Sequence, residues 1–128
     1  MPKNKLARRA ELATFSNVLQ PPVETKNRWH DIFGNHNPIT LELACGAGVY
    51  TLELSEMFPD KNFIGIDIKG VRLWHSAKAA LEEGITNARF LRIHIERLED
   101  YFLPHQQKII NPIRHGRIGL INLNITYG

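Results

Sequence analysis

The chain has 128 residues, a length that suits one compact domain and is short for two. With 43% hydrophobic and 23% charged residues, it has the composition of an ordinary globular protein, which excludes disordered, collagen-like and coiled-coil chains. Its single cysteine excludes an internal disulfide. No apolar stretch reaches the roughly 18–20 residues of a membrane span, so we expect a cytoplasmic protein without a membrane segment.

The net charge of +3 is unevenly distributed along the chain. Residues 1–30 carry six basic and two acidic side chains, residues 31–103 carry seven and eleven, and residues 104–128 carry three and none. Clustered basic residues are typical of contacts with nucleic-acid phosphates, although a solvated helix face gives the same pattern. The candidate RNA contacts are Lys5, Arg8, Arg9, Lys69 and Arg72.

The N-terminal part predicts a helix followed by an irregular connection. Residues 4–13 have apolar and small side chains at helical spacing opposite the arginines, a pattern that favours a short amphipathic helix. Residues 21–37 begin with two prolines and contain several turn-forming residues, so no regular element is expected there. We expect Trp29 and Phe33 to hold this connection against the domain.

From residue 39 onward, strands and helices alternate. Near-continuous apolar runs predict strands at residues 39–44, 62–68 and 88–93. Helices are expected from the glycine turn to residue 58, over residues 70–83 and over residues 96–102. This alternation implies an α/β fold with a Rossmann-like parallel sheet and flanking helices.

The helix over residues 70–83 has the clearest pattern. Its expected buried stripe comprises Val71, Trp74, Ala77 and Leu81. Trp74 is therefore interpreted as a core residue in preference to a platform for a stacked base. Gly84 stands where a left-handed C-terminal cap is expected.

A glycine turn after the first strand predicts a cofactor site. Gly46 and Gly48 allow a sharp strand-to-helix turn and let a ligand approach the backbone amides. Asp67 follows 19 residues after Gly48, at the end of the next strand, where a carboxylate can accept hydrogen bonds from both ribose hydroxyls. An adenosine-containing cofactor is the prediction, and a purely structural turn is the alternative. Thr51 occupies the place of a third glycine, which disfavours a dinucleotide.

Residues 41–48, Leu-Glu-Leu-Ala-Cys-Gly-Ala-Gly, resemble motif I of S-adenosylmethionine-dependent methyltransferases, in the form used by bacterial tRNA (guanine-N7-)-methyltransferases. Residues 58–70 and 87–92 resemble the second and third strands of that family. The segment over residues 5–19 is similar to the start of one bacterial branch. The resemblance covers about residues 4–102.

The resemblance implies a class I methyltransferase that moves a methyl group from S-adenosyl-L-methionine to N7 of a guanine in tRNA. Since N7 carries an in-plane lone pair, alignment with the methyl donor can suffice and no general base is required. The expected cofactor-binding residues are Glu42, Ala44, Gly46, Gly48, Asp67 and His94.

Two departures from the family pattern fall in the cofactor site. Ala44 replaces the first glycine of the usual motif, so a methyl group intrudes near the cofactor and weaker binding is expected. His94 stands where many members have an aspartate near the adenine, and an imidazole replaces only part of a carboxylate's acceptor capacity. A strand-end histidine without a ligand role is the alternative.

The largest departure follows Phe102, where the Phe-Pro-Asp-Pro motif of the family and its basic run are absent, so the catalytic residues stay unknown. We expect a truncated or frame-shifted reading of a longer gene, with residues 118–127 able to add a fourth strand. Uncovered sheet surface then predicts instability or self-association. Within the single domain of residues 1–128, we predict a basic extension over 1–37, a cofactor-binding core over 38–102 and a divergent tail over 103–128.

Other residue types suggest no further chemistry. Cys45 is interpreted as a small residue lining the turn in preference to a nucleophile, and the six histidines show no metal-ligand spacing. Three hypotheses remain. The first is a tRNA methyltransferase, the second is a non-catalytic RNA- or protein-binding remnant of that fold, and the third is a methyltransferase with another acceptor.

Overall fold

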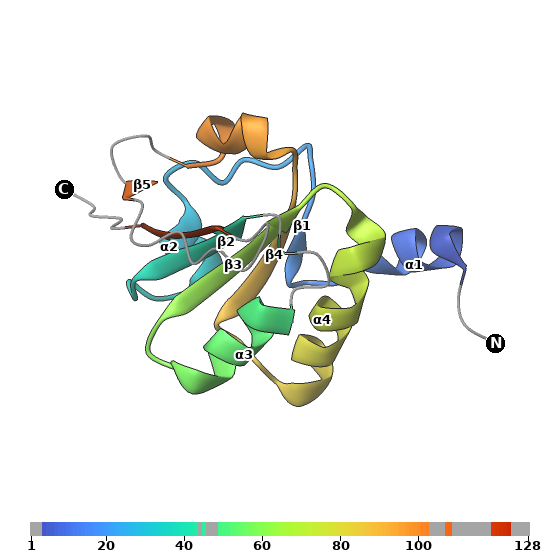
Figure 1. The fold of residues 1–128 in the computed structure, drawn as a ribbon, viewed down its shortest axis with the longest axis horizontal. Coiled ribbons are helices and arrows are strands. Elements are labelled where there is room, and N and C mark those ends of the chain that lie inside the picture. Colours follow the sequence, from blue (N-terminus) through green and yellow to red (C-terminus); the bar gives the residue numbers. More distant parts are fainter. Residues whose placement is uncertain (1–3, 44, 46–48, 103–106, 109–118, 124–128) are drawn as a thin grey trace.

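The computed structural model describes residues 4–43, 45, 49–102, 107–108 and 119–123. Within these residues the sheet has six strands in the order β1-β4-β3-β2-β6-β5 (Figure 1). The strands are β1 (Val18–Leu19), β2 (Ile39–Leu43), β3 (Asn62–Asp67), β4 (Ala88–Arg92), β5 (Gln107–Lys108) and β6 (Gly119–Leu123). The helices are α1 (Lys5–Leu12), α2 (Trp29–Phe33), α3 (Val49–Met57), α4 (Gly70–Glu83) and the 3-10 helix η1 (Ile95–Asp100). No described helix is both long and apolar enough to cross a membrane.

Four neighbouring strands are parallel, which confirms the predicted α/β fold. The chain passes from β2 through α3 to β3 and through α4 to β4, and each strand pairs in parallel with the one before it. The short strand β1, which the sequence pattern did not predict, adds a fourth parallel strand beside β4. The strand expected within residues 118–127 is present as β6, and it pairs antiparallel with β2.

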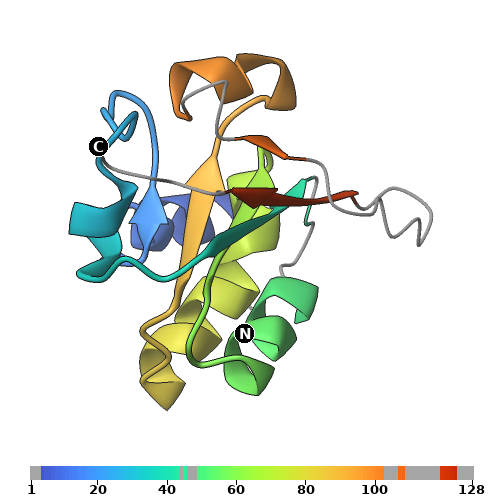
Figure 2. The ribbon, with the colours of Figure 1, turned by 90° about the vertical axis from the view of Figure 1, so that its left-hand side faces the viewer.

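Helices cover both faces of the central strands β2, β3 and β4. On one face, strand residues pack against α2 and η1 through Trp29, Phe33 and Leu98. On the other face, α1 and α4 contribute Leu12 and Leu73 to a second cluster, and Leu52 of α3 packs against it. Helices α3 and α4 lie side by side over this second face (Figure 1, Figure 2). The strands are therefore buried on both sides, which explains their near-continuous apolar sequences.

Helix α4 has the predicted bounds, but its buried face differs from the predicted stripe. The buried residues are Gly70, Leu73, Ser76, Ala77 and Ala80. Of the predicted set, Ala77 is buried as expected. Leu81 is 41% exposed, and Val71 and Trp74 are only half-buried. Small residues face the sheet because they let the helix pack closely, whereas the indole lies toward α1. Gly84 caps the helix with φ 70° and ψ 30°, as expected for a left-handed cap.

The connection over residues 21–37 is tied to the end of η1. Trp29 is 1% exposed and stacks on Phe102 with the ring centroids 5.1 Å apart. Its indole N–H donates to the carbonyl of Tyr101 at 2.9 Å, and the Thr25 hydroxyl donates to the same carbonyl at 2.9 Å. The predicted anchoring by Trp29 and Phe33 is confirmed, although Trp29–Phe33 forms the helix α2 within a segment expected to be irregular.

Gly65 in β3 lies where a side chain of α3 packs tightly against the sheet. A Cβ at this position would lie 3.0 Å from Oγ1 of Thr51, 3.1 Å from Sγ of Cys45 and 3.1 Å from Cδ1 of Phe90. These three side chains are buried and come from different elements. No single movement therefore makes room for a methyl group.

We expect Gly65→Ala to lower the free energy of unfolding by about 1–3 kcal/mol, as overpacking does in well-filled cores. Urea unfolding measures the change. Thr51→Ala, which removes the nearest atom, should cost less in the Gly65→Ala background than in the parent chain. Additive losses in the double variant would contradict this account of the close approach.

Candidate cofactor site

The carboxyl ends of β3 and β4 frame a hollow of about 170 Å³. Ligands of open parallel sheets bind at this edge, because the strand-to-helix connections there leave room between them. The described residues that line it are Asp67, Ile68, Ile93, His94, Ile95 and Glu96. We call it the cofactor hollow.

The chemistry of this lining suits a nucleoside. Asp67 is 7% exposed, and its Oδ1 accepts a hydrogen bond from the backbone N–H of Lys69 at 2.9 Å. A carboxylate has two oxygens and further acceptor capacity, which suits the paired hydroxyls of a ribose. Ile68 and Ile95 supply aliphatic surface, and Ile95 is 38% exposed although it is a large apolar residue. Such surface fits the faces of a purine base.

Glu42 lies on β2, the strand next to β3. It stands opposite Gly65 of β3 and is 2% exposed. Its Oε1 accepts hydrogen bonds from the backbone N–H of Thr51 at 3.1 Å and from the Thr51 hydroxyl. Thr51 belongs to the first turn of α3, where backbone N–H groups have no partner within the helix. The carboxylate therefore fixes the start of α3 against β2.

The second carboxylate oxygen of Glu42 is buried and accepts no hydrogen bond from the described residues. Burial raises the pKa of Glu42 above its ordinary value, and the two hydrogen bonds from Thr51 oppose this rise. A buried, incompletely satisfied carboxylate costs free energy that a hydrogen-bonding cation would offset. This unsatisfied acceptor therefore fits a ligand that donates from an ammonium group, as S-adenosylmethionine can.

Cys45 follows β2 and is buried, and its backbone N–H donates to the carbonyl of Ile66 at 2.9 Å. Burial raises the pKa of its thiol, and the negative charges of Glu42 and Asp67 raise it further. The thiol is therefore protonated at neutral pH and is a poor nucleophile, which agrees with its interpretation as a lining residue.

The structure brings together some of the predicted cofactor residues. Asp67 and His94 line the same hollow, and Glu42 is not among its described lining residues. Ala44, Gly46 and Gly48 lie outside the described residues, so their roles stay predictions.

Sequence reasoning missed the aliphatic lining residues and the role of Thr51. Ile68 and Ile95 directly follow Asp67 and His94 in the sequence, so adjacency to the predicted polar residues was the available signal. Thr51 was interpreted only as the residue that stands in place of the third glycine of a dinucleotide motif. Its contact with Glu42 depends on the packing of α3, which the spacing of motifs does not reveal.

The predicted RNA contacts divide into two groups. Lys5, Arg9, Lys69 and Arg72 line a separate hollow of about 330 Å³. Arg8 instead lies over the ring of Trp74, with its Cζ 4.8 Å from the ring centroid. The Arg8 guanidinium is also 3.5 Å from the ring nitrogen Nε2 of His75.

Comparison with known proteins agrees with this geometry. The family model Methyltransf_4, which describes methyltransferases, matches residues 36–111. The chain belongs to this methyltransferase family. The matched segment contains β2, β3 and β4, and thus the whole lining of the cofactor hollow.

Curated relatives make the likeness more specific. The chain is 50% identical over 113 residues to a tRNA (guanine-N(7)-)-methyltransferase of Christiangramia forsetii, covering 81% of this chain and 50% of the relative. It is 46% identical over 111 residues to the protein of that name from Bacteroides thetaiotaomicron, covering 80% and 44%. A Streptococcus agalactiae protein of the same name is 40% identical over 85 residues, covering 66% and 40%. The expected resemblance is confirmed, and the chain spans about half the length of these relatives or less.

Glu42→Gln tests the cost of the buried carboxylate. Because the pKa of Glu42 is raised in the folded chain, the unfolded chain loses this proton first as the pH rises above 4.5. The folded state therefore loses stability with rising pH from this group. We expect the parent chain to lose stability relative to Glu42→Gln between pH 4.5 and 7, as measured by urea unfolding.

The exposed Glu24→Gln is the matched control and should leave the pH dependence nearly unchanged. A parent chain that gains stability relative to Glu42→Gln over this pH range would contradict the assigned environment of Glu42.

Proposed function

We propose that this chain carries the S-adenosyl-L-methionine site of a tRNA (guanine-N7-)-methyltransferase, which transfers a methyl group to N7 of a guanine in tRNA. The observation that supports this most directly is the cofactor hollow, in which an acidic side chain adjoins aliphatic walls at the carboxyl edge of parallel strands. The names of the curated relatives support the choice of acceptor. A cytoplasmic location follows from this proposal.

The residues of the hollow have distinct proposed roles. Asp67 accepts hydrogen bonds from the ribose hydroxyls, while Ile68 and Ile95 contact the adenine. His94 lies at the edge of the hollow, where it can donate or accept one hydrogen bond. The free oxygen of Glu42 receives the ammonium group of the methionine portion. Ala44, Gly46 and Gly48 stay proposed backbone contacts.

The reaction requires little acid–base chemistry from the protein. S-adenosylmethionine, when bound, supplies a methyl group on a positively charged sulfur, and guanine N7 has a lone pair ready to accept it. The contribution of this chain is therefore to bind the donor in one orientation and to bring the guanine to it. No catalytic residue is assigned, because the acceptor-side motif of the family is absent from residues 103–128.

A second candidate is a non-catalytic RNA- or protein-binding remnant of the fold. The sequence feature that favours it is that residues 103–128 lack the Phe-Pro-Asp-Pro motif that the family uses on the acceptor side. Self-association through uncovered sheet surface stays a prediction of both candidates, and sedimentation velocity measures it.

Asp67→Asn is the sharpest test of the cofactor site. The substitution keeps the size of the side chain and an oxygen for the Lys69 N–H, but it removes the charge and one acceptor group. A hydrogen bond to a charged group contributes about 1.5–3 kcal/mol, so we expect at least roughly tenfold weaker binding of S-adenosylhomocysteine. Isothermal titration calorimetry gives the dissociation constants.

Asp60→Asn is the matched control, because Asp60 is exposed and precedes β3 at the opposite edge of the sheet. It should bind S-adenosylhomocysteine like the parent chain. Equal binding of S-adenosylhomocysteine by all three proteins would show that Asp67 does not contribute to the site. Absence of binding by the parent chain would refute the proposed cofactor.

Methyl transfer separates the two candidate functions. The methyltransferase proposal expects labelled methyl groups to pass from S-adenosylmethionine to an unmodified tRNA and to be found as borohydride-sensitive N7-methylguanine. Cofactor binding without any such transfer would favour the remnant.

A further inference from the structure

Basic side chains line two hollows next to the cofactor hollow. The first, of about 330 Å³, contains Lys5 and Arg9 of α1 together with two basic residues at the start of α4. The second, of about 270 Å³, contains Arg92 and Arg97. We call the combined set the basic track. It comprises Lys5, Arg9, Lys69, Arg72, Arg92 and Arg97.

The two hollows adjoin each other through Arg92. A Cβ added at Gly70, which lines the first hollow, would lie 3.0 Å from Cδ and 3.1 Å from Nε of Arg92. Arg92 itself lines the second hollow, which shares Ile68, Ile93 and His94 with the cofactor hollow. The basic track therefore runs from α1, past the start of α4, to the edge of the proposed methyl-donor site.

Most side chains of the track form no ion pair with another described residue. Among the described residues, Arg97 is the one member of the track with an ion pair, to Asp100 at 2.9 Å. The residues outside the description contain no acidic side chain, so no further carboxylate side chain is available there. Gathering like charges on one surface is unfavourable in the free protein, and it favours binding of an anion with several charges.

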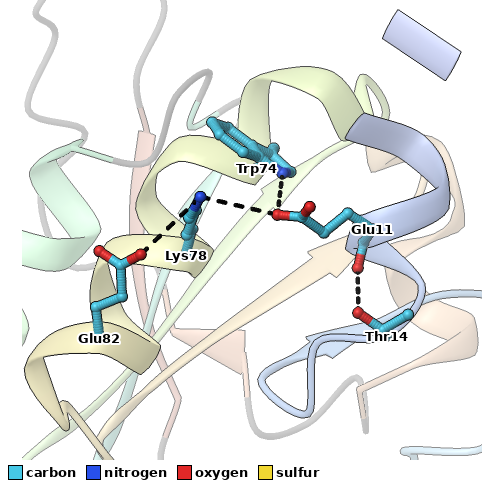
Figure 3. A network of polar contacts seen from close by, with 5 residues as sticks. All are labelled: Glu11, Thr14, Trp74, Lys78 and Glu82. Atoms are coloured by element: carbon cyan, nitrogen blue, oxygen red, sulfur yellow. Dashed lines mark hydrogen bonds and ion pairs between the residues drawn. The ribbon is translucent and has the colours of Figure 1, made fainter. Parts of the chain in front are cut away.

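Helix α1 is held firmly in the position that completes the track. Trp74 of α4 donates a hydrogen bond from its indole N–H to Oε1 of Glu11 at 3.1 Å, and Lys78 lies 4.0 Å from the same oxygen (Figure 3). The Lys78 ammonium is also 4.8 Å from the centroid of the Trp74 ring. Lys5 and Arg9 lie four residues apart and thus on one face of α1.

We propose that the basic track binds the phosphodiester backbone of the acceptor tRNA and brings its guanine toward the cofactor hollow. The choice of tRNA rests on the proposed function, whereas the surface is defined by the six side chains. An extended row of cations suits successive phosphates of one strand better than a single anion. Its position beside the methyl-donor site favours the acceptor RNA over an acidic lipid surface.

The test uses the full chain and a fluorescently labelled, unmodified tRNA transcript. Three double variants each remove two charges from the track, namely Lys5→Gln/Arg9→Gln, Lys69→Gln/Arg72→Gln and Arg92→Gln/Arg97→Gln. The matched control, Lys26→Gln/Lys61→Gln, removes two exposed charges outside the track. Fluorescence anisotropy gives the dissociation constant between 50 and 300 mM NaCl.

Each track variant is expected to bind tRNA at least roughly tenfold more weakly at low salt than the parent chain. Since each lost phosphate contact lowers the slope of log K against log salt by about 0.7–0.9, each double variant should lose between one and two units of slope. The control should retain both affinity and slope. Equal weakening of all four double variants, or absence of tRNA binding by the parent chain, would overturn the proposal.

Folding and cofactor binding are measured on the same proteins. Thermal unfolding shows whether each variant is folded, and Arg92→Lys, which keeps the charge, should restore part of the affinity lost at that position. Calorimetry with S-adenosylhomocysteine distinguishes this inference from the cofactor proposal, because the track variants should bind it like the parent chain. Vesicles containing phosphatidylserine provide the comparison surface, and binding to them without binding to tRNA would refute the RNA assignment.

Discussion

The position of the candidate site depends on one buried carboxylate. Glu42 joins the central strand β2 to the first turn of α3 by accepting two hydrogen bonds from Thr51. A negative charge at the N-terminal end of a helix is favourable, because the first backbone N–H groups point toward it. The contact also requires that α3 approach β3 closely, and the missing side chain of Gly65 makes this possible. The geometry is thus obtained at the cost of burying a charge, as the raised pKa of Glu42 records.

A single pair in the sheet separates the two proposed binding surfaces. Asp67 at the end of β3 stands opposite Arg92 at the end of β4. Asp67 lines the cofactor hollow, and Arg92 lines the adjoining basic one. Because a shift of one residue turns every side chain of a strand to the other face, the register of these strands decides which charge meets which ligand. The buried side chains of Phe90 and Leu91, which face opposite sides of the sheet, maintain that register.

Much of the central fold was predictable because its signals are local or repeated. The three central strands were expected within one residue of their observed ends, since strands buried on both faces have continuous apolar sequences. The bounds of α4 followed from its length and from Gly84. By contrast, β1 has two residues and α2 has five, too few to show a period. The predicted buried face of α4 was wrong at Trp74, because its contact with Glu11 of α1 is a tertiary contact that the helical period does not reveal.

The site shows the same division between local and tertiary information. Asp67 and His94 follow strands directly, so strand prediction alone placed them at one edge of the sheet. The hydrogen bonds between Thr51 and Glu42 could not be predicted from the sequence. Thr51 was noted only as a departure from the dinucleotide motif, and its hydroxyl reaches Glu42 because α3 packs on β2. Arg8 was grouped with its basic neighbours by sequence, but its position on the helix turns it toward Trp74. Residues three or four apart lie on the same face of a helix, whereas adjacent residues such as Arg8 and Arg9 do not.

The arrangement of the strands separates the proposed site of the methyl donor from the edge of β2 that pairs with β6. The cofactor hollow is formed by β3, β4 and η1, on one side of β2. The opposite edge of β2 pairs with β6, which contributes no described residue to that hollow. The proposed donor site therefore depends on the parallel strands, and Glu42, Gly65 and α3 stabilise their packing. The features that distinguish one acceptor from another must then act from the surfaces around the hollow, of which the basic track is the one that the described residues define.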